Sequence, residues 1–277
     1  MVQEFDTKMD EILKVAIDAA RAGGDIINAN ATRISSLNIE QKSLNDFVSE
    51  VDRQSEIAVK VLIHKSFPDH AFIGEEYGAS GRDESEYTWH VDPLDGTTNF
   101  LRSIPHYCVS IGVCYLGVPY VAVVFDPVKK ELYTAIKGQG AYLNDKPIAV
   151  AQLSNLNGAL LATGVPFSGA YLDKIDSFLG TMNGVLHENT SGIRRLGSAA
   201  LDLAYVAAGR YDGYWEAGLK SWDICAGLLL VQEAGGITSD LLGQPTSLFS
   251  GDVLAANRYV HAAMLTVSSV HYRPGGT

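Results

Sequence analysis

Residues 89–100 read Trp89-His90-Val91-Asp92-Pro93-Leu94-Asp95-Gly96-Thr97-Thr98-Asn99-Phe100. The apolar start of this segment predicts a strand that carries Asp92 to its end. Pro93 has no backbone N–H and a fixed φ, so we expect strand pairing to stop there. Gly96 permits a close approach of the backbone to a ligand, and Thr97-Thr98-Asn99 is expected to cap a following helix.

The two acidic residues of this segment favour a metal and phosphate site. Asp95 follows Asp92 by three residues, near enough for both carboxylates to face one point in a turn. A helix N-terminus beside them would attract a phosphate, and paired carboxylates suit a hard cation. By itself, D-x-x-D-G is more often only a turn. It is not an EF-hand loop, because Leu94 and Gly96 stand where oxygen ligands belong.

The composition indicates a compact globular protein. The chain has 277 residues, of which 47% are hydrophobic and 19% charged, enough for one large core or two subdomains. A formal net charge of −11 disfavours nucleic acid and anionic membranes as partners. The three cysteines form no CxxC pair, and no signal peptide or membrane-spanning stretch is apparent. We therefore expect a cytoplasmic protein.

Periodicity predicts an α+β layered fold. Amphipathic helices are expected over 8–31 and 50–66, and an antiparallel meander follows residue 107. The second half alternates strands and helices, including a buried helix over 224–234, and the tail 271–277 is expected to be mobile. The remaining expected strands are 71–74, 108–115, 120–125, 131–135, 141–143, 160–163, 211–216 and 253–255; the other expected helices are 170–186, one from Ser198 to Ala208, and one from about 259.

Three further acidic residues lie where side chains could join Asp92 and Asp95. Asp52 is near the start of the second helix, although a solvated helix-start acid is the simpler interpretation. Glu75 follows the strand 71–74, with Glu76 an equal candidate. Asp223 has apolar neighbours, so it needs either a partner or metal, or a helix-capping role.

These motifs together resemble the inositol monophosphatase family of Mg²⁺-dependent, lithium-sensitive sugar-phosphate phosphatases. Asp92–Phe100 is similar to the central family motif, and Trp222-Asp223-Ile224-Cys225-Ala226-Gly227, continuing to Gly236, is similar to the C-terminal one. Gly74-Glu75-Glu76 and Asp46–Asp52 are similar to the two N-terminal motifs. The motifs occur in the family order over nearly the whole chain.

The resemblance implies a layered αβαβα sandwich of the inositol monophosphatase and fructose-1,6-bisphosphatase type. The N-terminal half, 1–145, would carry most of the metal ligands. The C-terminal half, 146–277, would carry the substrate contacts and the last metal ligand. Members of the family typically form homodimers, so the resemblance also implies a homodimer.

The same resemblance implies roles for individual residues. Two or three Mg²⁺ ions would be held by Glu75, Asp92 as a bridge, the Leu94 carbonyl, Asp95 and Asp223. Asp52, Thr97 and Glu75 would be catalytic, with Thr97 linked to Asp52 and orienting a water for in-line attack. Substrate would contact Asp95, Gly96, Thr97, Ser198, Ala199, Glu216 and Asp223.

Some residues keep two interpretations. Glu216, without the resemblance, would be a strand-end surface acid. Thr163 and Lys220 are candidates for the pocket, although an exposed lysine is the simpler view, and Lys42 is a candidate for a flap near the metals. His90 stands where the family usually has an aliphatic residue, and a hydrogen-bonded structural histidine is favoured. Ser49 replaces the usual threonine.

The predicted function is inositol-1-monophosphatase activity, with direct attack of a metal-activated water on a polyol phosphate. The same chemistry on histidinol phosphate, fructose 1,6-bisphosphate or a nucleotide 3′-phosphate is the alternative, and Gly96 leans away from the nucleotide branch. A regulatory or binding protein with a secondary activity is a hypothesis of another class. The complete set of acidic residues argues against a vestigial site.

Overall fold

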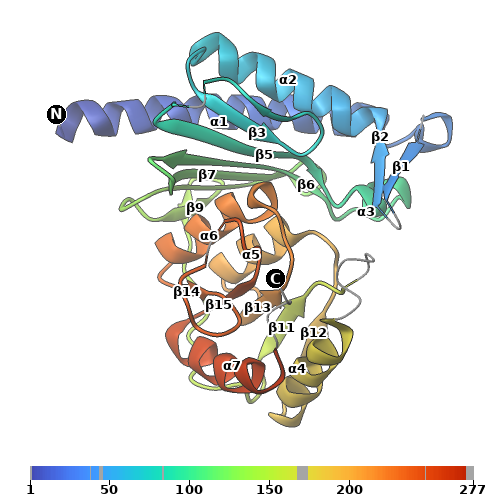
Figure 1. The fold of residues 1–277 in the computed structure, drawn as a ribbon, viewed down its shortest axis with the longest axis vertical. Coiled ribbons are helices and arrows are strands. Elements are labelled where there is room, and N and C mark those ends of the chain that lie inside the picture. The colour runs from blue at the N-terminus through green and yellow to red at the C-terminus, as the bar shows by residue number, and fades with distance from the viewer. Residues whose placement is uncertain are drawn as a thin grey trace.

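The computed structural model describes residues 2–37, 39–43, 46–82, 84–166, 174–246 and 248–272. Helices and sheets alternate in five layers (Figure 1). The first layer is α1 (Val2–Asn30) and α2 (Glu50–Ser66), which pack on one face of an eight-stranded sheet. The amphipathic pattern of both helices explains this placement, because their apolar sides are buried against the sheet.

The eight-stranded sheet has the order β10-β9-β8-β7-β6-β5-β3-β4. All neighbouring pairs are antiparallel except β3 and β5, which run parallel. This parallel pair brings Glu75, which follows β3, to the same edge as Asp92 and Asp95 at the end of β5. The strands are β3 (Ala71–Gly74), β4 (Gly78–Ser80), β5 (Tyr87–Asp95), β6 (Cys108–Tyr115), β7 (Val118–Asp126), β8 (Glu131–Ile136), β9 (Ala141–Leu143) and β10 (Lys146–Pro147).

Two helices form the middle layer, between the sheets. They are α5 (Ala199–Ala207) and α6 (Ser221–Glu233), and apolar residues surround both because each contacts both sheets. Close approach is needed where α6 crosses β6: a Cβ added at Gly112 would lie 2.4 Å from the Cys225 sulfur. Glycine is therefore required at this crossing.

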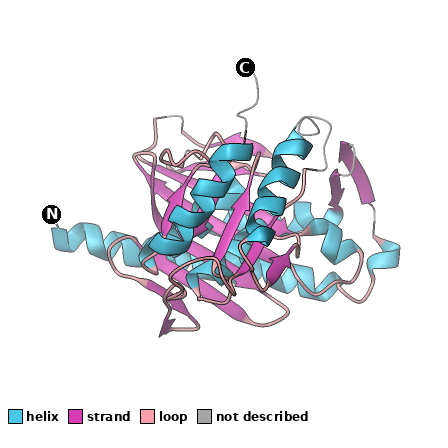
Figure 2. Ribbon diagram, turned by 90° about the horizontal axis from the view of Figure 1, so that it is seen from below, coloured by secondary structure: helices cyan, strands magenta, loops and turns pink. Residues whose placement is uncertain are grey.

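The second sheet has five strands in the order β12-β11-β13-β15-β14. Its outer face carries α4 (Ile175–His187) and α7 (Arg258–His271), and Figure 2 shows helices lying across strands on this side. The strands are β11 (Leu160–Thr163), β12 (Gly192–Arg194), β13 (Gly213–Glu216), β14 (Ile237–Ser239) and β15 (Val253–Ala256). Beside the first sheet lie the hairpin β1 (Ile39–Ser43) and β2 (Asp46–Ser49), and the short helices η1 (Ile34–Ser36) and α3 (Thr97–Leu101).

The α+β layered sandwich predicted from the sequence is confirmed. The meander agrees closely, with β6 and β9 at the expected residues, and β11 of the second sheet also lies where it was expected. The division into halves 1–145 and 146–277 stays a prediction. No helix within the described ranges has the length and apolar character needed to span a bilayer.

Four local expectations were wrong. Pairing does not stop at Pro93, because β5 resumes to Asp95 after a bulge. The Thr97–Asn99 segment does not cap α3; Gly96 is the N-cap, with φ of 100°. Helix α6 begins at Ser221, so Asp223 lies in its first turn. In the tail, the side chain of Tyr272 is buried and its hydroxyl donates to Asp252, whereas 273–277 lie outside the described residues.

Candidate active site

A bulge at the end of β5 places two carboxylates on the same face of the sheet. Asp92 pairs with Ser110 and Asp95 pairs with Cys108, so three steps on β5 match two on β6. The Leu94 side chain points to the opposite face, into the core beneath α1 and α2. The Ser55 hydroxyl holds the bulge by donating to the Pro93 carbonyl at 2.9 Å. The extra residue therefore turns Asp95 back to the side of Asp92.

Glu75 joins them from the neighbouring strand. Its amide donates to the Val91 carbonyl, and its charge raises the pKa of Asp92. The turn that presents Glu75 is shaped by Glu56, a fully buried carboxylate that accepts from the amides of Glu76 (2.7 Å) and Tyr77 (3.0 Å). Of the two adjacent candidates, Glu75 is thus the one placed toward the aspartates. Sequence reasoning missed Glu56, although it lies one helical turn after Asp52.

Asp223 reaches the same place from the first turn of α6. Its carboxylate accepts from the Lys220 amide at 2.7 Å, so the capping role considered from the sequence is present. The charges of Asp95 and Glu75 raise its pKa, which places it among the other acids as well. One carboxylate therefore serves both the helix start and the acidic cluster.

Burial and mutual repulsion govern the electrostatics of this acidic cluster, namely Glu75, Asp92, Asp95 and Asp223. Burial raises the pKa of Asp92 and Asp223 well above the ordinary value, and like charges add to the effect. Burial also raises the pKa of Asp95, to about 6, although the Ser198 hydroxyl and the Ala200 amide donate to it at 2.7 Å. Hard oxygen donors that repel one another fit a divalent cation such as Mg²⁺.

This repulsion gives a test on the protein without added metal. Because the folded state holds a proton on Asp95 up to about pH 6, folding stability is lost as pH rises from about 4 through 6. Asp95→Asn removes this loss, so its free energy of unfolding relative to the parent should increase by on the order of 1–3 kcal/mol across that range. Urea unfolding in a chelator would measure it, with the exposed Glu84→Gln as control. A difference independent of pH would contradict the assignment.

Asp52 and Thr97 form a hydrogen-bonded pair beside the cluster. The Thr97 hydroxyl lies 2.7 Å from Asp52 Oδ1 and 3.1 Å from the Leu94 carbonyl oxygen. Asp52 Oδ2 accepts from the Ser49 amide (2.9 Å) and hydroxyl (2.6 Å), a capping-box contact at the start of α2. Asp52 is fully buried, and burial raises its pKa, so the interpretation as a solvated acid was wrong.

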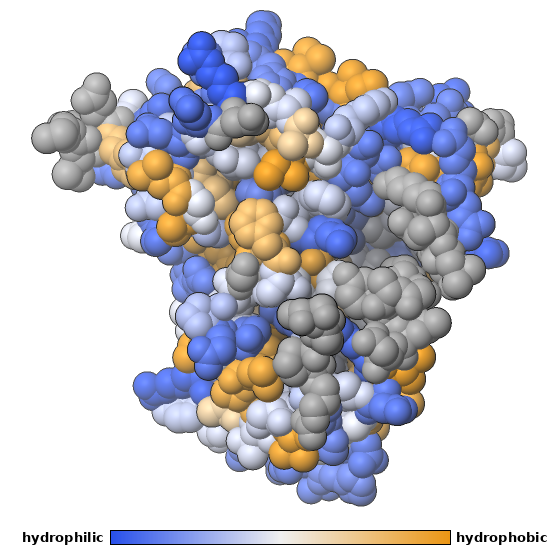
Figure 3. Space-filling model, in the orientation of Figure 1, coloured by the Kyte–Doolittle hydropathy of each residue, from blue (hydrophilic) through white to orange (hydrophobic). Residues whose placement is uncertain are grey.

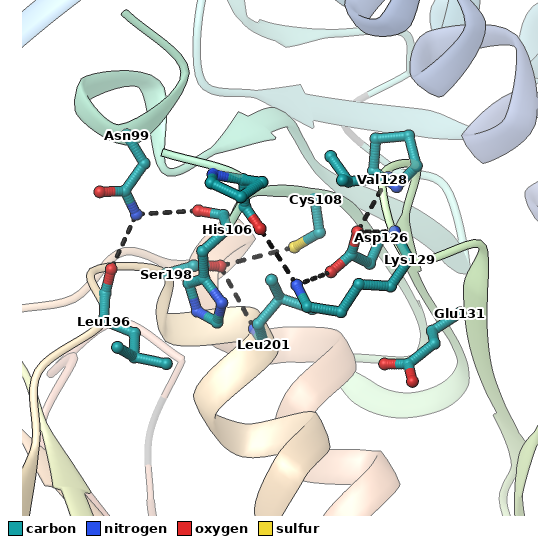
Figure 4. Close-up of polar contacts among 12 residues, drawn as sticks. Asn99, His106, Cys108, Asp126, Val128, Lys129, Glu131, Leu196, Ser198 and Leu201 are labelled. Atoms are coloured by element: carbon teal, nitrogen blue, oxygen red, sulfur yellow. Dashed lines mark hydrogen bonds and ion pairs between the residues drawn. The ribbon is translucent and has the colours of Figure 1, made fainter. Parts of the chain in front are cut away.

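The opposite wall, the side of the candidate site that faces the acidic cluster, is formed by residues from the second half of the chain. Ser198 caps α5 and lies beside Cys108 and Leu201, as Figure 4 shows. In the same view, Asn99 donates to the carbonyls of His106 (2.8 Å) and Leu196 (2.7 Å). The Leu196 contact ties α3 to the loop that precedes α5 and so joins the two walls, whereas the His106 contact fixes the loop between α3 and β6.

Glu216 closes this wall at the end of β13. Its carboxylate accepts from the Tyr214 hydroxyl, and burial raises its pKa to about 7 although Tyr214 and Arg195 oppose the shift. A Cβ at Gly164 would collide with it, at 1.7 Å from Oε1. The interpretation of Glu216 as a surface acid was therefore wrong. Sequence reasoning also missed Asp202, whose buried Oδ1 has no hydrogen-bond partner among the described residues.

The remaining candidates do not join the cluster. Thr163 is buried and donates to the Trp215 carbonyl at 2.7 Å. Lys220 is exposed, and the side chain of Lys42 lies outside the described residues. His90 is buried, with Nδ1 2.9 Å from the Ser221 hydroxyl, which is the hydrogen-bonded role expected from the sequence.

A layered αβαβα sandwich with an acidic cluster at the end of a central strand defines the class of sugar-phosphatase folds. The family model described as "Inositol monophosphatase family" matches residues 8–272. The chain therefore belongs to the inositol monophosphatase family.

Individual relatives agree with this assignment. The chain is 44% identical over 268 residues to the Nus factor SuhB of Pseudomonas aeruginosa, covering 96% of this chain and 98% of the relative. The crystal structure of the extragenic suppressor protein suhB from Bartonella henselae matches with a TM-score of 0.89, 36% identity and coverage of 93% and 98%. The inositol monophosphatase from Anabaena matches with a TM-score of 0.81, 36% identity and coverage of 96% and 98%.

Proposed function

We propose that this chain is a Mg²⁺-dependent phosphomonoesterase that hydrolyses myo-inositol monophosphate to inositol and phosphate. The observation that carries the proposal is the acidic cluster, whose buried carboxylates raise one another's pKa. Glu75, Asp92, Asp95, Asp223 and the Leu94 carbonyl would hold two or three ions. When bound, Mg²⁺ supplies an acidified water and neutralises charge on the attacking and leaving oxygens.

The chain's own groups would orient the attacking water. The Thr97 hydroxyl donates its hydrogen to Asp52 at 2.7 Å, so its oxygen lone pairs are available to accept a hydrogen from water. The buried Asp52, fixed by Ser49, supports this orientation and can receive a proton through Thr97. Attack by water then needs no covalent phosphoenzyme.

Phosphate and alcohol would contact different walls. The amides of Gly96 and Thr97 would hold phosphate oxygens, and the positive φ of Gly96, with the His106 carbonyl 3.0 Å from any added Cβ, favours glycine there. Hydrogen bonds with the hydroxyls of the polyol would be made by Glu216, Ser198 and Ala199. The pKa of Glu216, about 7, suits this task, because its carboxyl group can donate a hydrogen bond when protonated and accept one when ionised.

A substrate panel tests the proposal. Phosphate release from myo-inositol 1-phosphate is expected to require Mg²⁺ and to be inhibited by lithium. No release from any phosphomonoester would reject the enzyme proposal. A preference for histidinol phosphate, fructose 1,6-bisphosphate or a nucleotide 3′-phosphate would reject only the choice of substrate.

A second role is favoured by the name Nus factor SuhB of relatives that are 44% identical. We infer that the chain also acts in transcription through a protein partner, since its charge of −11 disfavours direct contact with nucleic acid. On the face in Figure 3, hydrophobic side chains are interspersed among hydrophilic ones. Capture of RNA polymerase by both the parent and an inactive Asp92→Asn variant would separate this role from catalysis.

We also propose that the chain forms a homodimer and is located in the cytoplasm.

A further inference from the structure

A cluster of one histidine and two cysteines lies on the side of the sheet that faces α6. His90 pairs with Gly112 across β5 and β6, and Cys114 stands two residues further along the same face. Cys225 enters from α6 above Gly112, where a Cβ would leave it no room. The ligand atoms of His90, Cys114 and Cys225 lie within 4.8 Å of one another, and all three residues are buried.

We propose that His90, Cys114 and Cys225 form a second metal site, which binds one thiophilic ion such as Zn²⁺. This site is separate from the acidic cluster and has the opposite ligand chemistry. Two thiolates and an imidazole select soft or borderline ions, whereas carboxylates and carbonyls select Mg²⁺.

The sulfur separation fits a metal better than a disulfide. The Cys114 and Cys225 sulfurs are 3.7 Å apart. Two sulfurs bound to one tetrahedral Zn²⁺ at about 2.3 Å each would be about 3.8 Å apart. A disulfide would need the two sulfurs to lie about 2 Å apart, much closer than they are.

The surroundings of the histidine also suit a ligand. Its Nδ1 is engaged with the Ser221 hydroxyl at 2.9 Å, which leaves Nε2 for a metal and fixes the ring orientation. The two thiols differ: hydrogen bonds from Cys225 and His90 lower the pKa of Cys114 to about 6 against the effect of burial, whereas the contact with Cys114 and burial raise the pKa of Cys225 well above its ordinary value, so a bound ion would have to displace the Cys225 proton. The thiolate is the form that binds metals.

The proposed metal site lies close in sequence to two carboxylates of the acidic cluster. His90 lies two residues before Asp92, and Cys225 lies two residues after Asp223. An ion held by β5, β6 and α6 would therefore fix the strand and the helix that carry these carboxylates. Among the described residues, no fourth histidine, cysteine or acid joins the three, so one coordination position stays open.

Cobalt absorption tests the proposal directly. The full chain, reduced, freed of metals and supplied with excess Mg²⁺, would be titrated with Co²⁺ without oxygen. We expect a thiolate-to-cobalt charge-transfer band that saturates at one ion per chain and is removed by Zn²⁺. Cys114→Ala and Cys225→Ala should lose the band. Cys108→Ala, which removes the buried cysteine outside the cluster, should keep it.

A second measurement needs no variant, in case the alanine variants fail to fold. X-ray absorption of the zinc-loaded chain should show about two sulfur neighbours at about 2.3 Å. Only oxygen and nitrogen neighbours, or no cobalt band, would overturn the proposal. So would a Cys114–Cys225 disulfide in the purified chain, shown by a mass two hydrogen atoms lower and by the masses of the linked peptides. None of these results depends on phosphatase activity.

Discussion

Asp92→Asn is expected to lower kcat for phosphate release by on the order of 10³-fold or more. Burial raises the pKa of Asp92, and the charges of Glu75, Asp95 and Asp223 add to the effect, so Asp92 lies near every other member of the acidic cluster. An amide has one oxygen ligand and no charge, so it cannot bridge two cations. Steady-state kinetics over a wide range of Mg²⁺ concentration would measure the loss. Near-normal turnover at ordinary Mg²⁺ would reject the bridging role.

The same variant supplies its own folding control. Without added metal, Asp92→Asn removes one of several repelling buried charges, so we expect a higher melting temperature than the parent at neutral pH. Loss of activity together with a gain in stability would show that the carboxylate serves metal binding at the expense of the fold. A marked fall in stability would instead indicate that Asp92 mainly holds structure, through its contact with the Leu94 amide at 2.9 Å.

Thr97→Val is expected to reduce kcat by about 10²–10⁴-fold with little change in KM. The substitution keeps the shape of the side chain but removes the hydroxyl that lies 2.7 Å from Asp52. A water in the site would then lose its orienting acceptor. Thr97→Ser, which keeps the hydroxyl, should retain most of the activity.

The pair can be tested as a unit. Because Asp52 is proposed to act through Thr97, the double variant Asp52→Asn with Thr97→Val should lose no more activity than the worse single variant. Fully additive losses would show that the two residues act independently. A rise in KM alone would place Thr97 in substrate binding only.

Much of the fold could be predicted from local patterns. The meander from β6 to β9 was expected because apolar runs are separated by Gly and Pro turns, and its strands lie at nearly the expected residues. The start of α6 was placed three residues too late, because apolar periodicity begins at Ile224 whereas the helix begins with the polar Ser221. Periodicity reports burial and leaves a polar first turn undetected.

The active site was harder to predict from the sequence, because it depends on contacts between segments that lie far apart in the chain. The acidic residues of the cluster are recognisable in the sequence from their positions at element ends and from the family resemblance. Glu56 and Asp202 were missed because each lies inside a helix, where a buried carboxylate has no sequence signature of its own. Only the contact of Glu56 with the turn after β3, and the proximity of Asp202 to Glu216, distinguish them.

The bulge between Asp92 and Asp95 makes the path of the backbone in this motif as important as the identity of its residues. In an unbroken strand, residues three apart face opposite sides of the sheet. Here one extra residue restores both carboxylates to the same side. If β5 kept this three-residue spacing but lost the bulge, Asp95 would point toward α1 and α2, although every acid would still be present. The Ser55 hydroxyl that holds the bulge through the Pro93 carbonyl therefore matters to the acidic cluster as much as the acids themselves.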